Sequence, residues 1–178
     1  MARSNQNRKE ECAQRSQEGD VLWMLSKQLL GNLYEPVHTA CGLLHAPHRY
    51  PTLDYENLLK LTFALTRNHA DVEEMVRRMI FNVKSGNRDD HSKNFSFLLT
   101  SKNEWRLAPA YDLTPCAGLN GEHTAMVNGK GRDITDADLI ATAATCGVPE
   151  SKVRAMLADV EAALNQHRLR QKAVEKSN

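Results

Sequence analysis

The chain has 178 residues, of which 41% are apolar and 25% are charged, and its formal net charge is +1. This composition is ordinary for one globular domain, and the small charge excludes a general electrostatic attraction to nucleic acid or to anionic membranes. No window of about 18 apolar residues could form a membrane helix, and the N-terminal sequence does not resemble a secretory signal. We therefore expect a cytoplasmic protein without a membrane partner.

The predicted elements begin after an atypical segment. Residues 1–36 are largely polar and contain one short apolar patch. Residues 37–44 are compatible with a helix or a loop, and Tyr55–Thr66 predicts a helix. Residues 71–84 place apolar side chains at i, i+3, i+4 and i+7, the spacing of a buried helix face, and Gly86 is suited to end that helix in a left-handed conformation.

A β-hairpin is predicted next. Phe95, Phe97 and Leu99 occupy alternate positions, as in a strand with one buried face. Residues 100–104 are polar enough to form a turn, and Trp105–Leu107 predicts the returning strand.

Two more helices are predicted towards the C-terminus. Thr135 and Asp138 form a helix-start pair, and Gly147 ends that helix. A last helix starts at about Glu150 and fades into a basic polar tail at residues 167–178. The predicted fold is mostly α, with a small β-hairpin that holds the site described next.

Three residues around the hairpin follow the order of a kinase catalytic site. Asp89 is followed five residues later by Asn94, and Asp112 comes after the hairpin. Protein kinases use an Asp to accept the proton of the substrate hydroxyl, and then an Asn and an Asp to hold Mg²⁺. Asp89 and its neighbour Asp90 could also be turn residues, an interpretation that the agreement of the remaining features disfavours.

The motifs in this region resemble a known family. The segments DDHSKNFSFL and WRLAPAYDLTP are similar to the C-terminal lobe of HipA-like serine/threonine kinases, the toxins of type II toxin-antitoxin systems. That family has an Asp-x-His-x-Lys-Asn-Phe loop, and Pro-x-Tyr-Asp after a hairpin. The matching residues here are Asp89, His91, Lys93, Asn94, Phe95, Pro109, Tyr111 and Asp112. The resemblance implies a kinase-like lobe at residues 37–166, between the segment 1–36 and the basic tail.

The resemblance also implies a role for each site residue. Asp89 would be the catalytic base, and Asn94 and Asp112 would hold Mg²⁺. The residues that would bind the nucleotide, ATP, are His91, Ser92, Lys93, Asn94, Tyr111 and Asp112. On the sequence alone, His91 is equally compatible with a core histidine, and Tyr111 with a packing role.

Kinases of this type need further phosphate contacts from a Gly-rich loop and a strand lysine. No such segment precedes Asp89 in this sequence, so we expect the chain to be a poor or inactive kinase alone. A truncated gene, a frameshifted start or a separately encoded N-terminal lobe, which would then be a partner, would each produce this pattern. The resemblance implies two more partners, a protein substrate with a Ser or Thr hydroxyl and an antitoxin-like DNA-binding repressor. The chain itself carries no direct nucleic-acid signal.

Two other function classes stay open. The chain could be a non-catalytic remnant or interaction module that binds an antitoxin-like partner, in which case the three kinase-like residues are dispensable. It could also be a metal-dependent hydrolase built on Asp89, Asp90, His91 and Asp112, although their spacing matches no such site. Phosphorylation that requires ATP would distinguish the kinase from hydrolysis that requires only a metal.

Two further patterns predict no site. The Gly-Lys-Gly sequence at 129–131 lacks the G-x-x-x-x-G-K-[ST] pattern of a phosphate loop and predicts a surface turn. Several histidines lack the spacing of metal ligands and are expected to be structural or exposed. They are His38, His45, His48 and His123.

Overall fold

The computed structural model describes residues 36–44 and 54–175. The predicted segment 1–36 therefore lies almost wholly outside the described residues. In chain order the elements are β1 (Val37–Thr39), α2 (Ala40–Leu43), α3 (Tyr55–Thr66), α4 (His69–Ser85), the 3₁₀ turn η1 (Ser92–Asn94), β2 (Ser96–Leu99), β3 (Trp105–Leu107), α5 (Asp136–Ala144) and α6 (Glu150–Glu175).

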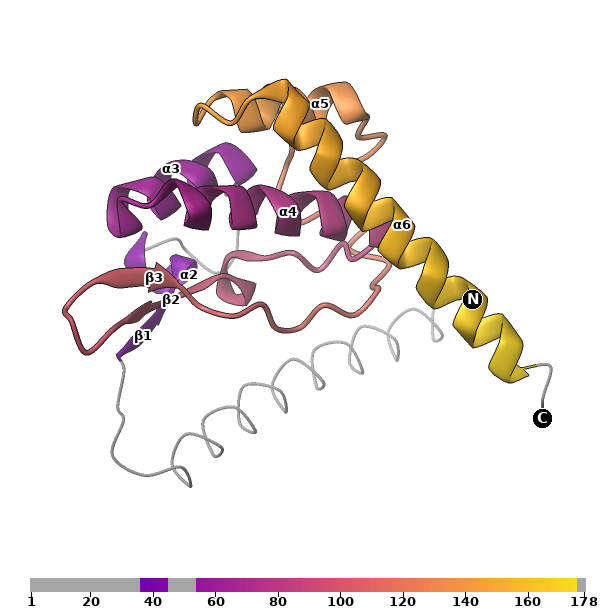
Figure 1. The fold of residues 1–178 in the computed structure, drawn as a ribbon, viewed down its shortest axis with the longest axis horizontal. Coiled ribbons are helices and arrows are strands. Elements are labelled where there is room, and N and C mark those ends of the chain that lie inside the picture. The colour runs from indigo at the N-terminus through magenta and orange to yellow at the C-terminus, as the bar shows by residue number, and fades with distance from the viewer. Residues whose placement is uncertain (1–35, 45–53, 176–178) are drawn as a thin grey trace. The chain divides into compact units, whose positions relative to one another are not determined.

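The strands form an antiparallel sheet in the order β1-β2-β3 (Figure 1). Val37 pairs with Leu98 between β1 and β2, and Leu98 pairs with Arg106 between β2 and β3. The predicted hairpin is confirmed. The strand β1 was not predicted, because a strand of three residues is too short to show an alternating pattern.

The helices α3 and α4 are joined by Arg67 and Asn68. Arg67 ends α3 in a left-handed conformation with φ 51°, and the Asn68 side chain accepts a hydrogen bond from the backbone of Ala70 to start α4. The helix predicted at 71–84 is confirmed, although it begins earlier, at His69. Gly86 ends it with φ 75°, as its sequence position predicted.

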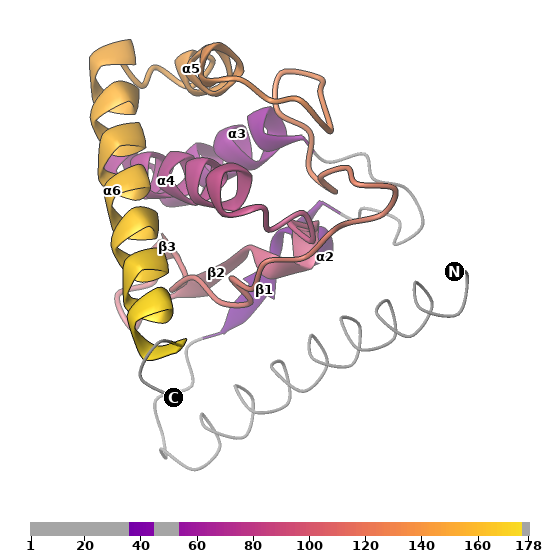
Figure 2. The ribbon, with the colours of Figure 1, turned by 90° about the vertical axis from the view of Figure 1, so that its right-hand side faces the viewer.

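α3 and α4 form a layer on one side of the sheet and contact β3, and α5 lies beyond them in an outer layer (Figure 1). α6 runs from the level of α5 past α4 to the level of the sheet (Figure 2). Fully buried core residues include Met75 and Met79 of α4, Leu139 of α5 and Val153 of α6. α4 therefore contacts both the sheet and the outer helical layer, and the candidate site loop leaves its C-terminal end.

Asp71 of α4 fixes β3 in place. Its carboxylate accepts hydrogen bonds from Arg106 Nε at 2.9 Å and Nη2 at 3.0 Å, and from the Leu107 backbone at 3.3 Å. The two bonds that Arg106 donates to Asp71 raise the pKa of the Arg106 guanidinium above its usual value. The end of the hairpin is therefore tied to the helix that precedes the site loop.

The predicted start of α5 is confirmed, and it explains the Gly-Lys-Gly turn. The Asp138 carboxylate accepts hydrogen bonds from the Thr135 backbone, from Asn128 Nδ2 and from Lys130 Nζ, each at 2.9 Å. These bonds, that of Asn128 first, hold the pKa of Asp138 well below its usual range. Lys130 is thus bound to the first turn of α5, and residues 129–131 form a turn, as predicted.

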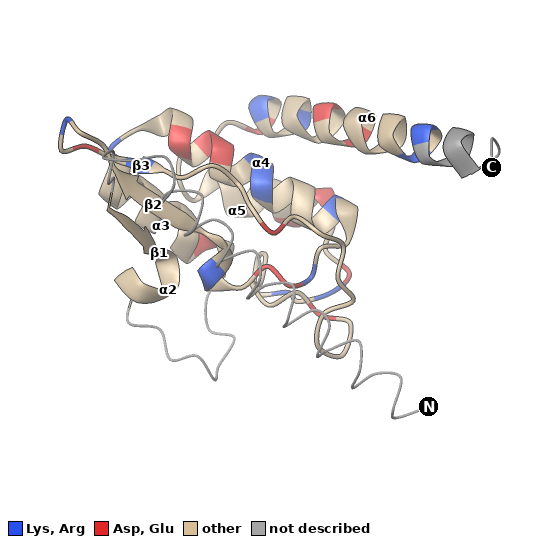
Figure 3. Ribbon diagram, turned by 90° about the horizontal axis from the view of Figure 1, so that it is seen from below, with Lys and Arg blue, Asp and Glu red and all other residues tan. Residues whose placement is uncertain are grey.

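The last helix, α6, is longer than predicted. It begins at Glu150 as expected but continues to Glu175, through most of the region predicted as a tail. Its apolar face is buried as far as Val160, whereas Leu169 is exposed. Charged residues of both signs lie along α4 and α6 (Figure 3), and Lys84 of α4 pairs with Glu161 of α6 at 2.6 Å. No helix in the described ranges is long and apolar enough to cross a membrane.

Candidate functional site

The loop between α4 and β2 is held on both sides by a later part of the chain. The backbone N–H of Arg88 donates to the Cys116 carbonyl at 3.1 Å. The carbonyl of the same residue accepts hydrogen bonds from the backbone N–H and the Oγ1 of Thr124, both at 3.1 Å. The loop that carries Asp89 and Asp90 is therefore fixed in position by segments about 30 residues further along.

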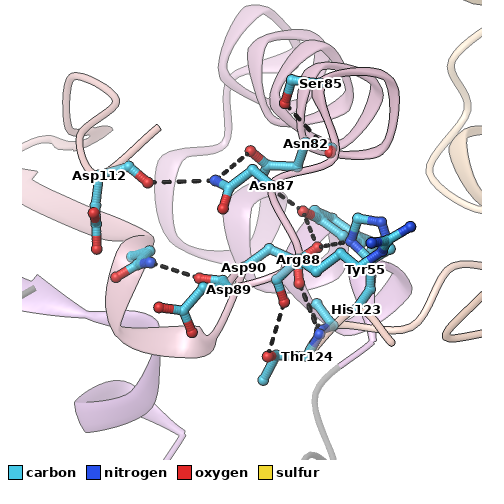
Figure 4. Close-up of polar contacts among 12 residues, drawn as sticks. Tyr55, Asn82, Ser85, Asn87, Arg88, Asp89, Asp90, Asp112, His123 and Thr124 are labelled. Carbon is cyan, nitrogen blue, oxygen red and sulfur yellow. Dashed lines mark hydrogen bonds and ion pairs between the residues drawn. The ribbon is translucent and has the colours of Figure 1, made fainter. Parts of the chain in front are cut away.

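The side chain of Asp90 is at the centre of a buried polar cluster, which we call the Asp90 cluster (Figure 4). It is fully buried, and its carboxylate has four hydrogen-bond partners. They are Tyr55 Oη at 3.0 Å, His123 Nδ1 at 2.9 Å, and the backbone N–H groups of Thr124 at 2.8 Å and Ala125 at 3.1 Å. These four bonds give Asp90 a structural role, although the residue also lines the pocket described below.

A chain of hydrogen bonds leads from this cluster to Asp112. The Tyr55 hydroxyl also accepts from Asn82 Nδ2 at 2.9 Å, and Asn82 Oδ1 accepts from Asn87 Nδ2 at 3.1 Å. Asn87 Nδ2 makes a second contact, at 3.3 Å, with the Asp112 carbonyl. Burial, together with the nearby Asp90 charge, raises the pKa of Tyr55 well above its usual value, so this residue remains a protonated donor.

Asn94 and Asp112, the predicted magnesium ligands, line one pocket. The pocket opens to solvent, and its empty space of about 240 Å³ includes that open solvent; Tyr111 and Arg78 also line it. Asn94 Nδ2 donates to the Asp89 carbonyl at 2.8 Å, which leaves the Asn94 amide oxygen as its cation-binding atom. Asp112 has a left-handed backbone, with φ 54°. The structure therefore brings together two oxygen-bearing side chains that the sequence separates by a hairpin.

Asp89, the predicted base, lies on the other side of the loop from the Asp90 cluster. Its carboxylate points away from Tyr55 and His123 (Figure 4), and its side chain is 31% exposed. Asp89 is not part of the pocket wall. Its carbonyl, however, accepts a hydrogen bond from Asn94, which lines the pocket. A solvent-accessible carboxylate next to a pocket is positioned to accept a proton from a substrate hydroxyl.

His91, Ser92 and Lys93 form the turn around η1, and none of the three is in the pocket wall. His91 Nδ1 accepts from the Lys93 backbone at 3.2 Å, so this side chain caps the turn. The Tyr111 hydroxyl donates to the Lys93 carbonyl and lies 2.5 Å from Ser96 Oγ. Tyr111 thus has the packing role that the sequence left open, and it also lines the pocket.

The donor set of the pocket fits magnesium. Mg²⁺ is usually bound by one or two protein oxygen ligands together with waters and substrate phosphates, and Asn94 and Asp112 supply two such oxygens. Across residues 36–44 and 54–175, no three His, Cys, Asp or Glu side chains gather as metal ligands. With Asp90 fully engaged in the fold, the hydrolase set of Asp89, Asp90, His91 and Asp112 is not assembled.

Several residues of this region were not singled out by the sequence. Asn87 looked like a turn residue after Gly86, and Arg78 like one more helix arginine next to Arg77. His123 was expected to be structural or exposed, and its bond to Asp90 shows that it is structural. Sequence spacing gave no signal for these contacts, because each joins segments far apart in the chain.

Comparison with known proteins decides the family. The profile of the HipA-like C-terminal domain matches residues 27–168. The chain belongs to this family. Among curated relatives, the protein named "Putative kinase Y4dM" of Sinorhizobium fredii is 34% identical over 82 residues, and a "Putative kinase" of Haemophilus influenzae is 39% identical over 61 residues. These alignments cover 46% and 34% of this chain and 20% and 18% of the relatives.

A solved structure has the same fold as this HipA-like domain. It is the Shewanella oneidensis MR-1 toxin-antitoxin system HipA, HipB and its operator DNA complex. The match has a TM-score of 0.65 at 19% identity, and it covers 74% of this chain and 36% of the other. The predicted fold, mostly α with a small β-hairpin in a kinase-like lobe, is confirmed. The chain spans about a third of this neighbour's length.

Proposed function

We propose that this HipA-like domain binds ATP with Mg²⁺ and forms the catalytic lobe of a kinase that phosphorylates a Ser or Thr hydroxyl on a protein. The observation that carries the proposal is the pocket shared by Asn94 and Asp112, with the accessible carboxylate of Asp89 beside it. Family membership and the names of the two curated relatives support the same reaction class.

The chemistry assigned to the residues is simple. Asp89 orients the substrate hydroxyl and accepts its proton while the oxygen bonds to the γ-phosphorus, the bond to the β-phosphate oxygen breaks, and ADP leaves. Asn94 and Asp112 hold the metal at the phosphates. Mg²⁺ supplies charge neutralisation, on which phosphoryl transfer largely depends.

The pocket wall holds the carboxylates of Asp90 and Asp112 and one cation, Arg78, and a site with few cations binds an anionic nucleotide weakly. We therefore propose that the pocket needs further phosphate contacts, from another part of the protein or from a partner. Because the solved neighbour is a complex with HipB and operator DNA, we also propose an antitoxin-like DNA-binding protein as a partner.

The test is calorimetric titration of the full chain with Mg²⁺ and a non-hydrolysable ATP analogue. Asp112→Asn is the test variant, and Asp133→Asn is its control, because Asp133 is also left-handed, with φ 52°, but exposed and outside the pocket wall. Binding that disappears only in Asp112→Asn supports the proposal. A folded chain that binds neither Mg²⁺ nor the nucleotide, even weakly, overturns it and favours the non-catalytic interaction module.

A further inference from the structure

The backbone that carries Asp112 is held in an unfavourable conformation. Residues 108–112 lead from the end of β3 to the pocket, and Asp112 has φ 54°, a left-handed value that costs free energy in residues other than Gly, although less in Asp and Asn than in most. Surrounding contacts can offset this cost. At Asp112 such contacts come from two buried side chains, one at each end of residues 108–112.

Arg78 holds the first end. Arg78 lies on α4 and is buried, with 7% of the residue exposed. Its Nη2 donates to the Ala108 carbonyl at 2.7 Å. Its Nε donates to Glu74 one turn earlier, at 3.1 Å, which fixes the direction of the guanidinium. The guanidinium thus joins α4 to the start of residues 108–112, in the wall of the pocket that Asp112 also lines.

Asn87 holds the other end. It is buried, and its Nδ2 lies 3.3 Å from the Asp112 carbonyl and 3.1 Å from Asn82 Oδ1. Its own backbone N–H donates to the Asn82 carbonyl at 3.0 Å, just past the end of α4. Both ends of residues 108–112 are therefore bonded to buried side chains that α4 positions.

One feature of Arg78 is difficult to explain by folding alone. Its Nη1 is buried and has no hydrogen-bond partner in the described part of the chain. A buried, incompletely bonded guanidinium costs stability, and an apolar side chain of similar size often serves a core equally well or better. An apolar side chain could not replace the bond from Nη2 to the Ala108 carbonyl, which joins α4 to residues 108–112.

We infer that Arg78 and Asn87 are positioning residues for Asp112: together they hold residues 108–112 so that the Asp112 carboxylate faces the pocket. The metal-binding consequence rests on the proposed function, whereas the conformational effect does not. If the two residues served only the fold, an apolar replacement of Arg78 would leave Asp112 unchanged.

The experiment measures the Asp112 conformation directly, by the ¹³Cα and ¹³Cβ NMR chemical shifts of that residue in the full chain. The variants are Arg78→Met, Arg78→Lys and Asn87→Ser. Arg77→Met is the matched control, because Arg77 is the neighbouring residue of α4 but its side chain is 43% exposed and pairs with Asp159. Circular dichroism and thermal unfolding establish which variants are folded.

In folded variants we expect Asp112 to lose its left-handed chemical shifts and Mn²⁺ binding to weaken tenfold or more, while Arg77→Met matches the wild type. Unchanged Asp112 shifts in the folded variants overturn the inference. So does a failure of all three variants to fold, because the two residues would then serve the fold as a whole. A wild-type chain that binds no Mn²⁺ counts against the proposed function, and the chemical shifts still decide the inference.

Discussion

Asp89 and Asp90 are adjacent in the chain, but their carboxylates lie in opposite environments. The Asp90 side chain is fully buried among its four donors, whereas the Asp89 side chain is 31% exposed and points away from them. Asp90 therefore fixes the loop from within the fold, whereas the Asp89 side chain is partly exposed beside the pocket and lies 3.9 Å from His91 Nε2. Substitutions at the two positions should separate stability from chemistry.

Alanine substitutions test the difference in stability. Asp90→Ala leaves buried donors of Tyr55, His123 and the backbone without an acceptor, so we expect the free energy of unfolding to fall by about 3 kcal/mol or more. Asp89→Ala should lower it by less than about 1 kcal/mol, as is usual for a partly exposed charge. Urea unfolding of both variants measures this, and equal losses would contradict the assigned roles.

Substitutions of Asp89, the proposed base, and of Asp112, the proposed metal ligand, should affect metal binding differently. Asp89→Asn removes a proton acceptor but no ligand, so Mn²⁺ and nucleotide binding should stay within about threefold of the wild type, a difference below about 1 kcal/mol. Asp112→Asn should weaken Mn²⁺ binding, because a neutral amide replaces a carboxylate ligand. Titration followed by electron paramagnetic resonance distinguishes the two, and a large loss in Asp89→Asn would show that Asp89 binds the metal.

Tyr55 links the Asp90 cluster to Asn82, so Tyr55→Phe should destabilise the fold. The loss of one hydroxyl that both donates and accepts should cost about 1–3 kcal/mol near neutral pH. Because the fold raises the pKa of Tyr55, the neutral form contributes stability that is complete below the unfolded pKa of about 10 and is lost as the pH rises above it. Wild type should therefore lose more stability than Tyr55→Phe between pH 9 and about pH 11. Parallel curves for the two proteins would show that Tyr55 is not the titrating group.

The loss of the Asp138 charge should lower the free energy of unfolding at acidic pH. Its pKa is lowered in the fold, so its contribution is present above the unfolded pKa of about 3.9 and is lost as the pH falls below that value. Wild type should thus lose more stability than Asp138→Asn between about pH 5 and pH 2. Asp133→Asn is the control, because Asp133 is exposed and outside this set of bonds. Chemical unfolding across the pH range provides the comparison, and an Asp138→Asn curve that matches the wild type would refute the assignment.

The sequence predicted the parts of the molecule that follow local rules. The apolar spacing of α4, the Gly86 stop and the Thr135–Asp138 start depend on residues within one or two helical turns, and all three are confirmed. The hairpin followed from alternation and a polar turn. The order of Asn94 and Asp112 around it placed two side chains that the structure finds in one pocket.

What the sequence did not predict depends on distant contacts. Arg77 and Arg78 are identical in type and adjacent, and only packing against residues 108–112 buries one of them. Asp90 meets its partners 33 to 35 residues away, a separation that no periodic pattern encodes. The exposed length of α6 was also missed, because a charged sequence favours a solvated helix and a tail equally.

Arg88 is hydrogen-bonded to both Cys116 and Thr124, so the loop of residues 117–122 begins and ends next to the same residue. These residues are mostly exposed, so a break in the peptide chain among them would leave both broken ends bonded to the site loop. Such a break near Asn120 would not separate Asp90 from His123, which stay joined by their hydrogen bond. Within the described residues, the bonds around Arg88 and Asp90 hold this region together without the backbone of residues 117–122.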